Sequence, residues 1–84
     1  YNRAEFEGAL AKVVIENGLG VISYFGLAAG FLTGKYRSEA DLAKSPRGAG
    51  VKKYLDERGF RILAALDAVS AGIGATQAQV ALAW

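Results

Sequence analysis

Three glycines followed by a lysine form the part of the sequence whose residue types best suit binding chemistry. Gly26, Gly30 and Gly34 recur at a four-residue spacing, and Lys35 follows the last of them. Glycines let backbone N–H groups approach an anion closely, and a lysine supplies a point charge for phosphate. The spacing is one residue short of a Walker loop, and Gly18-Leu-Gly20 lacks the third glycine of a dinucleotide fingerprint. An ordinary surface loop is the alternative interpretation.

Positive charge is concentrated directly after these glycines. Between Lys35 and Lys53 the sequence has a local charge of +4, from six basic and two acidic residues, whereas the whole chain of 84 residues carries +2. A locally basic segment favours an anionic partner. The alternative is a solvated surface loop.

Several kinds of catalytic site are excluded by composition. The chain has no histidine and no cysteine, so it has no thiolate nucleophile, and neither a zinc site nor a Ser-His-Asp triad is expected within it. The adjacent acidic residues Asp56 and Glu57 point in different directions on a helix, which favours a solvated face over a catalytic pair. We therefore expect neither catalytic residues nor a metal site in these residues.

The elements that would position the glycines are a helix and a strand. The apolar spacing predicts a helix over about residues 3–17, opened by a capping box of Asn2 and Glu5 and closed by Asn17-Gly18. Residues 20–25 are a β-branched and aromatic run, which predicts a strand buried on both faces. Because ligands in α/β folds bind at the carboxyl ends of strands, the glycine segment is the expected site. Tyr24 then either packs in the core or stacks on a planar ligand.

The second half of the chain is predicted to be mostly helical. Residues 36–50 form a long polar connection, in which Ser38 caps a short helix that ends near Lys44. A longer helix is predicted from about 51 to 71, with Gly59 as a weak point. Its apolar face is expected to contain Ile62, Leu66, Val69 and Ile73. After a break at residues 72–74, Thr76 and Gln79 form a capping box that opens a last helix.

A membrane helix is a remote alternative for residues 17–34. This stretch has eighteen consecutive uncharged residues, and its glycines have the spacing of a packing seam. Five glycines and a helix-stop signal at its start weigh against a membrane span.

Five segments together resemble one enzyme family. Residues 20–37 resemble the seventh strand and following loop of aldo-keto reductases, and residues 38–48, 53–63 and 75–84 are similar to the long-loop bacterial members. The opening residues 1–3 resemble the segment just after the family's sixth strand. The resemblance covers essentially the whole chain, in family order and at family spacing.

The resemblance implies an α/β fold and a specific activity. The chain would be a fragment of a (β/α)8 TIM barrel, comprising helix 6, strand 7, the cofactor loop, helix 7 and the start of the following helix. A complete barrel has about 250 residues, so residues 1–84 would be a partial domain with no complete independent domain. The parent would be an NADPH-dependent oxidoreductase that reduces an aldehyde or ketone, with NADPH and a small carbonyl compound as partners. Neither nucleic acid nor membrane is expected as a partner, and the location is expected to be cytoplasmic.

The resemblance also assigns cofactor contacts. It implies that the tyrosine at the strand end stacks on the nicotinamide, that the loop lines the cofactor and that the lysine contacts its phosphates. An arginine of the long loop is expected to reach the cofactor from above. The implied cofactor-binding residues are Tyr24, Phe25, Gly26, Leu27, Ala28, Gly30, Leu32, Gly34, Lys35 and Arg47.

Two departures from the family pattern bear on function. Phe25-Gly26 stands where many members have Ser-Pro, so the serine hydroxyl contact is missing. The family's catalytic Asp, Tyr, Lys and His would lie upstream of Tyr1, so this chain alone is expected to be inactive and to need the rest of the barrel for folding. The alternatives are a non-catalytic member of the same fold that acts as a subunit or redox sensor and, more remotely, a membrane or anion-binding module.

Overall fold

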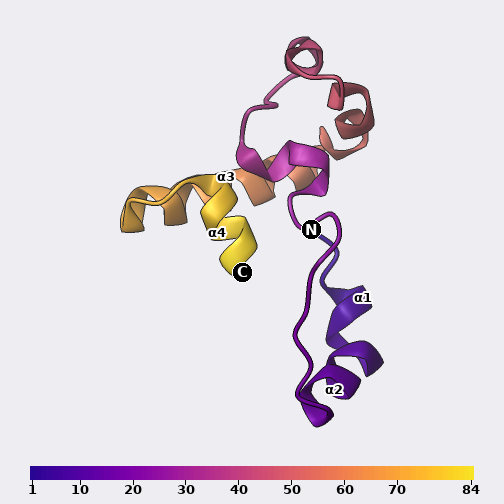
Figure 1. Ribbon diagram of the computed structural model, residues 1–84. Coiled ribbons are helices and arrows are strands. Elements are labelled where there is room, and N and C mark those ends of the chain that lie inside the picture. Colours follow the sequence, from indigo (N-terminus) through magenta and orange to yellow (C-terminus); the bar gives the residue numbers. More distant parts are fainter.

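The computed structural model describes all 84 residues, and every regular element in it is helical (Figure 1). The elements are α1 (Ala4–Glu7), α2 (Ala9–Glu16), the 3₁₀ helices η1 (Ala28–Thr33), η2 (Glu39–Lys44) and η3 (Gly48–Tyr54), then α3 (Glu57–Ile73) and α4 (Gln77–Ala83). No strand is present. The prediction of an α/β fragment of a (β/α)8 barrel is therefore wrong for this structure.

The missing strand has a simple physical reason. Residues 20–24 make no backbone hydrogen bond, because no other segment of the chain lies beside them as a pairing strand. A β-branched composition favours extended backbone, but a strand also needs a partner for its N–H and C=O groups. The run predicted to be buried is exposed instead, with Ile22 fully accessible and Tyr24 89% accessible.

The N-terminal helix is interrupted where one helix was predicted. Gly8 adopts a non-helical conformation (ψ −124°) and separates α1 from α2. The predicted Asn2 capping box does not form, since Arg3 is the N-cap and its guanidinium pairs with Glu7 at 2.7 Å. The predicted stop is confirmed: Asn17 caps α2 and its side-chain amide donates to the Val13 carbonyl at 2.8 Å.

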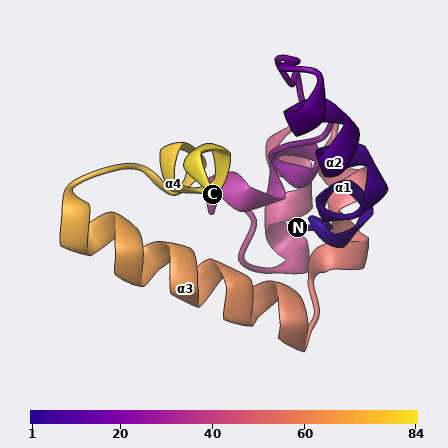
Figure 2. The ribbon, with the colours of Figure 1, turned by 90° about the horizontal axis from the view of Figure 1, so that it is seen from below.

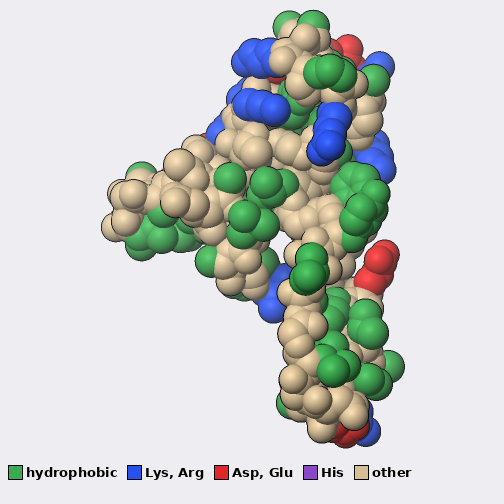
Figure 3. Space-filling view, in the orientation of Figure 1, with side chains coloured by type: hydrophobic (Ala, Val, Ile, Leu, Met, Phe, Trp, Pro, Cys, Tyr) green, Lys and Arg blue, Asp and Glu red, His purple; other side chains and the backbone are tan.

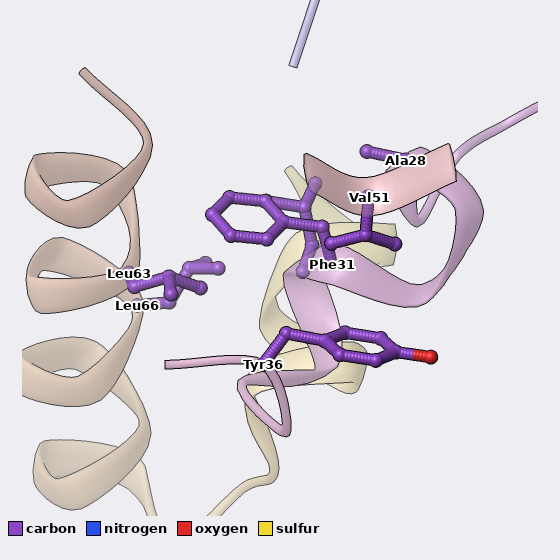
Figure 4. Close-up of a cluster of buried hydrophobic side chains, with 7 residues drawn as sticks. Ala28, Phe31, Tyr36, Val51, Leu63 and Leu66 are labelled. Atoms are coloured by element: carbon purple, nitrogen blue, oxygen red, sulfur yellow. The ribbon is translucent and has the colours of Figure 1, made fainter. Parts of the chain in front are cut away.

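The core is a small cluster between the 3₁₀ helices and α3. Leu63 and Leu66 of α3 point toward the ring of Phe31, with Tyr36 and Val51 beside them (Figure 4). The buried cluster consists of Ala28, Phe31, Leu32, Tyr36, Val51, Leu63 and Leu66. Three of the seven members, Ala28, Phe31 and Leu32, belong to η1, and Tyr36 lies three residues after its end. The glycine segment is therefore anchored to the core.

Helix α3 begins six residues later than predicted. Residues 51–54 belong to η3, and Asp56 caps α3 by accepting from the Gly59 N–H at 2.7 Å. The buried stripe of α3 consists of Gly59, Leu63, Leu66 and Ser70, so the predicted apolar face is only partly correct. Val69 and Ile73 are exposed.

The predicted capping box of the last helix is confirmed, whereas the predicted break at residues 72–74 is confirmed only at Gly74, because α3 continues through Gly72 and Ile73. Gly74 ends α3 in the left-handed region (φ 67°). Thr76 and Gln79 form the capping box of α4. Ser38 also caps η2 as predicted, and its N–H donates to Asp41 Oδ2 at 3.1 Å.

The molecule is elongated. Its radius of gyration is 14.4 Å, against about 12 Å for a compact domain of this length. The excess comes from an arm, residues 4–24, in which α1, α2 and the returning extended segment project from the rest of the chain (Figures 1 and 2). Helix α4 folds back against α3 and η1.

No single helix is long and apolar enough to cross a membrane. By length and composition alone, α3 and α4 pass that test as a pair, although they are bent by 100° at their junction.

Candidate anion-binding groove

The glycine segment adopts an unusual backbone. Left-handed φ values occur at Phe25, Ala28, Ala29, Gly30 and Gly34. Such values cost little at glycine but are strained at a residue with a Cβ. The surrounding contacts hold the strain in place, because Ala28 is buried in the core together with the adjoining η1 residues. The sequence located this segment, but it did not indicate that three non-glycine residues would adopt this conformation.

An open groove of about 780 Å³ lies between this segment and η3. Its lining residues are Ser23, Tyr24, Phe25, Gly26, Leu27, Ala29, Gly30, Arg47, Gly50, Lys53, Tyr54 and Leu82. The lining contains aromatic rings, three hydroxyl groups and two cations, and it contains no carboxylate. These groups suit a ligand that is both planar and anionic.

Six of the ten cofactor residues predicted from the sequence line this groove. They are Tyr24, Phe25, Gly26, Leu27, Gly30 and Arg47. Two others, Ala28 and Leu32, are buried in the core, where they anchor the segment without facing the groove. Gly34 and Lys35 lie outside the lining.

Lys35 lies next to the groove without lining it. Its ammonium is 5.1 Å from the centroid of the Tyr36 ring. A Cβ placed on Gly30 would lie 3.8 Å from Lys35 Nζ. The ammonium therefore lies beside Gly30, which is a residue of the lining.

A polar junction fixes the end of the glycine segment. Arg37 forms a two-pronged pair with Asp67 at 2.9 and 2.8 Å, and its Nε donates to the Gly34 carbonyl at 2.7 Å. Gln77 Nε2 donates to the same Asp67 carboxylate at 3.0 Å. The Arg37–Asp67–Gln77 junction thus joins the glycine segment to α3 and α4.

The junction perturbs its carboxylate. The hydrogen bonds from Arg37, and then that from Gln77, lower the pKa of Asp67 to about 2. The same interaction raises the pKa of Arg37. Lys44 is the main cause that lowers the pKa of Asp41 to about 2. Both carboxylates are therefore ionised at neutral pH, and each forms an ion pair with a cation outside the groove.

Lys and Arg side chains gather over the part of the molecule that contains η2 and η3 (Figure 3). Three of the six cations of the basic segment form ion pairs, and three, including Lys35, do not. Arg37, Lys44 and Lys52 pair with Asp67, Asp41 and Glu39 at 2.8, 2.7 and 3.5 Å, respectively. The two that line the groove, Arg47 and Lys53, form no ion pair.

Lys53 was not among the residues predicted for the site. Residues 51–71 were interpreted as one α-helix, but residues 48–54 form the 3₁₀ helix η3. A 3₁₀ helix has three residues per turn, so residues three apart share a face. Arg47, Gly50 and Lys53 have this spacing and all line the groove. The signal in the sequence that could have identified Lys53 is this three-residue spacing after Pro46.

The whole chain matches one known protein family. The model of the aldo/keto reductase family matches residues 1–84, which is the whole sequence. The chain therefore belongs to the aldo/keto reductase family, as the sequence resemblance implied. The match supports an oxidoreductase activity for the protein. No solved structure matches the chain significantly.

Proposed function

We propose that residues 1–84 supply part of the nicotinamide cofactor site of an NADPH-dependent aldo-keto reductase. The observation that carries the proposal is the groove, in which aromatic rings and unpaired cations meet along the glycine segment. Family membership supports the oxidoreductase class. The groove adds the reason why a planar, phosphate-bearing cofactor would bind at this place.

The aromatic and the charged residues of the lining would have different roles. The exposed ring of Tyr24, held edge-on to Phe25 at 4.6 Å between centroids, would stack on the nicotinamide. The guanidinium of Arg47 would contact phosphate, and Gly26 and Gly30 would let the cofactor approach the backbone. Lys35 would add charge from beside Gly30, outside the lining. When bound, NADPH would supply the hydride that reduces the carbonyl group.

The catalytic acid and base are proposed to lie outside these residues. Carbonyl reduction needs a positioned proton donor. The two acidic side chains with a lowered pKa, Asp41 and Asp67, are held in ion pairs outside the groove, and no carboxylate lines it. The role of this chain is thus to bind and orient the cofactor.

The proposal is tested by NADPH titration of the full product of the gene that encodes residues 1–84, followed by nucleotide fluorescence. Tyr24→Ala should weaken binding by about 1–3 kcal/mol, the scale of a lost aromatic stack, whereas Tyr24→Phe should retain most of the affinity. Lys35→Met should weaken binding by about 1.5 kcal/mol or less, because this cation lies outside the lining of the groove.

The control is Phe60→Ala, which removes an exposed aromatic ring of α3 that lies outside the groove. It should leave the dissociation constant unchanged. If the wild-type gene product does not bind NADPH, or if Tyr24→Ala and Phe60→Ala bind it equally well, the groove is not the cofactor site.

A further inference from the structure

We propose that Lys53 is a ligand-binding cation of the groove, and that together with Arg47 it holds the phosphate-bearing part of a dinucleotide. This inference rests on the proposed function, because it concerns the same groove. It adds a residue that was not assigned from the sequence, and it names the part of the ligand that the residue would contact.

The first observation is the register of η3. Arg47 is the N-cap of η3, and Lys53 lies two turns further along the same face. Gly50, which lies between them on that face, has nothing within 4 Å of the position a Cβ would occupy. The two cations therefore border an open strip of backbone, along which an anionic group can approach both.

The second observation is that the Lys53 ammonium is held in place. It lies 5.2 Å from the centroid of the Tyr54 ring, within the range of a cation–π contact. Tyr54 in turn stacks on Phe31, with centroids 5.4 Å apart, and Phe31 is fully buried. A lysine restrained in this way loses less conformational freedom on binding than a free surface lysine.

The third observation is the distribution of charge around the two cations. The neighbouring Lys52 does not line the groove and pairs with Glu39 at 3.5 Å. Lys53 has no such partner, and no carboxylate lines the groove to provide one. Two unpaired cations in one groove repel each other until an anion neutralises them.

The chemistry that satisfies this arrangement is a ligand with an aromatic ring system and at least two negative charges. Tyr24 and Phe25 supply the ring-binding part of the lining, and Arg47 and Lys53 supply the charge. In NADPH the two sources of such charge are the pyrophosphate and the additional ribose phosphate. NADH carries only the first, so a comparison of the two nucleotides distinguishes them.

The test is fluorescence titration of the full gene product with NADPH and, separately, with NADH. Lys53→Met should raise the dissociation constant for NADPH about 5- to 10-fold, and the increase should shrink as NaCl is added. Lys53→Arg should restore most of the affinity. An equal loss for both nucleotides assigns Lys53 to the pyrophosphate, and a loss for NADPH alone assigns it to the additional phosphate.

The matched control is Lys52→Met, which removes the same charge one residue away and should change neither dissociation constant more than slightly. Thermal melts followed by circular dichroism establish that each variant is folded. If the wild type binds NADPH but Lys53→Met binds it as tightly as Lys52→Met does, the inference is overturned while the proposed function stands. If the wild type binds neither nucleotide, the inference about Lys53 and the proposed function are both overturned.

Discussion

At the scale of single residues, the Arg37–Asp67–Gln77 junction gives the clearest consequence for stability. The pKa of Asp67 is lowered to about 2 in the folded chain, whereas an unfolded chain has the ordinary value of about 3.9. Because the folded-state pKa is the lower one, the stabilisation is fully present above about pH 4. It is lost progressively as the pH falls toward 2.

We therefore expect Asp67→Asn to lower the melting temperature of the full gene product at pH 7. The difference from wild type should narrow as the pH is lowered from 4 to 2, where the wild-type carboxylate also becomes neutral. Circular dichroism melts over this pH series measure it. Glu16→Gln is the control. Glu16 is exposed, and its pair with Lys12 is a weak surface pair with a distance of 3.8 Å. An equal effect of both substitutions would show that the junction does not stabilise the fold.

At the scale of elements, two glycines of α3 have opposite roles. A Cβ on Gly59 would overlap the Tyr54 carbonyl oxygen and would lie 3.0 Å from Phe31 Cζ, so the start of α3 packs directly on η3 at this position. A Cβ on Gly72 would meet nothing within 4 Å. Gly59, interpreted from the sequence as a weak point in a helix, is thus a site of close packing.

Gly59→Ala should destabilise the protein by about 1–3 kcal/mol, as overpacking does in other interiors. Gly72→Ala should stabilise it by about 0.5–1 kcal/mol, because alanine is the better helix former in open surroundings. Urea unfolding of the two variants provides the comparison. If both substitutions changed the free energy of unfolding in the same direction, the contact described for Gly59 would be contradicted.

The elements that could be predicted are those that depend on neighbours in the sequence. The capping boxes at Ser38 and Thr76, the stop at Asn17 and the break at Gly74 each involve groups a few residues apart. The strand at residues 20–25 could not be decided in this way, because its formation depends on a second segment to pair with. Local residue preferences favoured it, and the structure provides no pairing segment.

The candidate site was predictable to a similar degree. The glycine spacing located the segment, and six of the residues assigned by resemblance line the groove. The left-handed backbone at Ala28 and Ala29 accompanies packing against the core, which no local pattern reveals, and exposed Phe25 adopts it as well. Lys53 was missed because its face depends on whether residues 48–54 wind as a 3₁₀ or an α-helix.

At the scale of the whole molecule, the arm carries a large apolar surface. Its exposed large apolar residues are Leu10, Val13, Ile15, Leu19, Val21, Ile22 and Tyr24, and exposed Phe25 follows directly. The extended part also has unpaired backbone groups at residues 20–24. Both features favour association with other chains.

The 84-residue chain produced by itself should therefore self-associate, and sedimentation velocity over a concentration series should detect this. Ile22→Lys should reduce the association, because Ile22 is fully accessible on the arm. Ile73→Lys makes the same change at the end of α3, away from the arm, and should not reduce it. A wild-type chain that remains monomeric at every concentration would contradict the expectation.

The winding of η3 also determines which changes of chain length this region tolerates. In a 3₁₀ helix each residue turns the direction of the side chain by about 120°. One residue inserted after Arg47 would carry Lys52 to the groove-facing position that Lys53 now holds, so a cation would remain there. One residue deleted there would bring Tyr54 to that face and remove the charge. Because Lys52 and Lys53 are adjacent, the groove would keep its second cation when this segment is lengthened by one residue but would lose it when the segment is shortened by one.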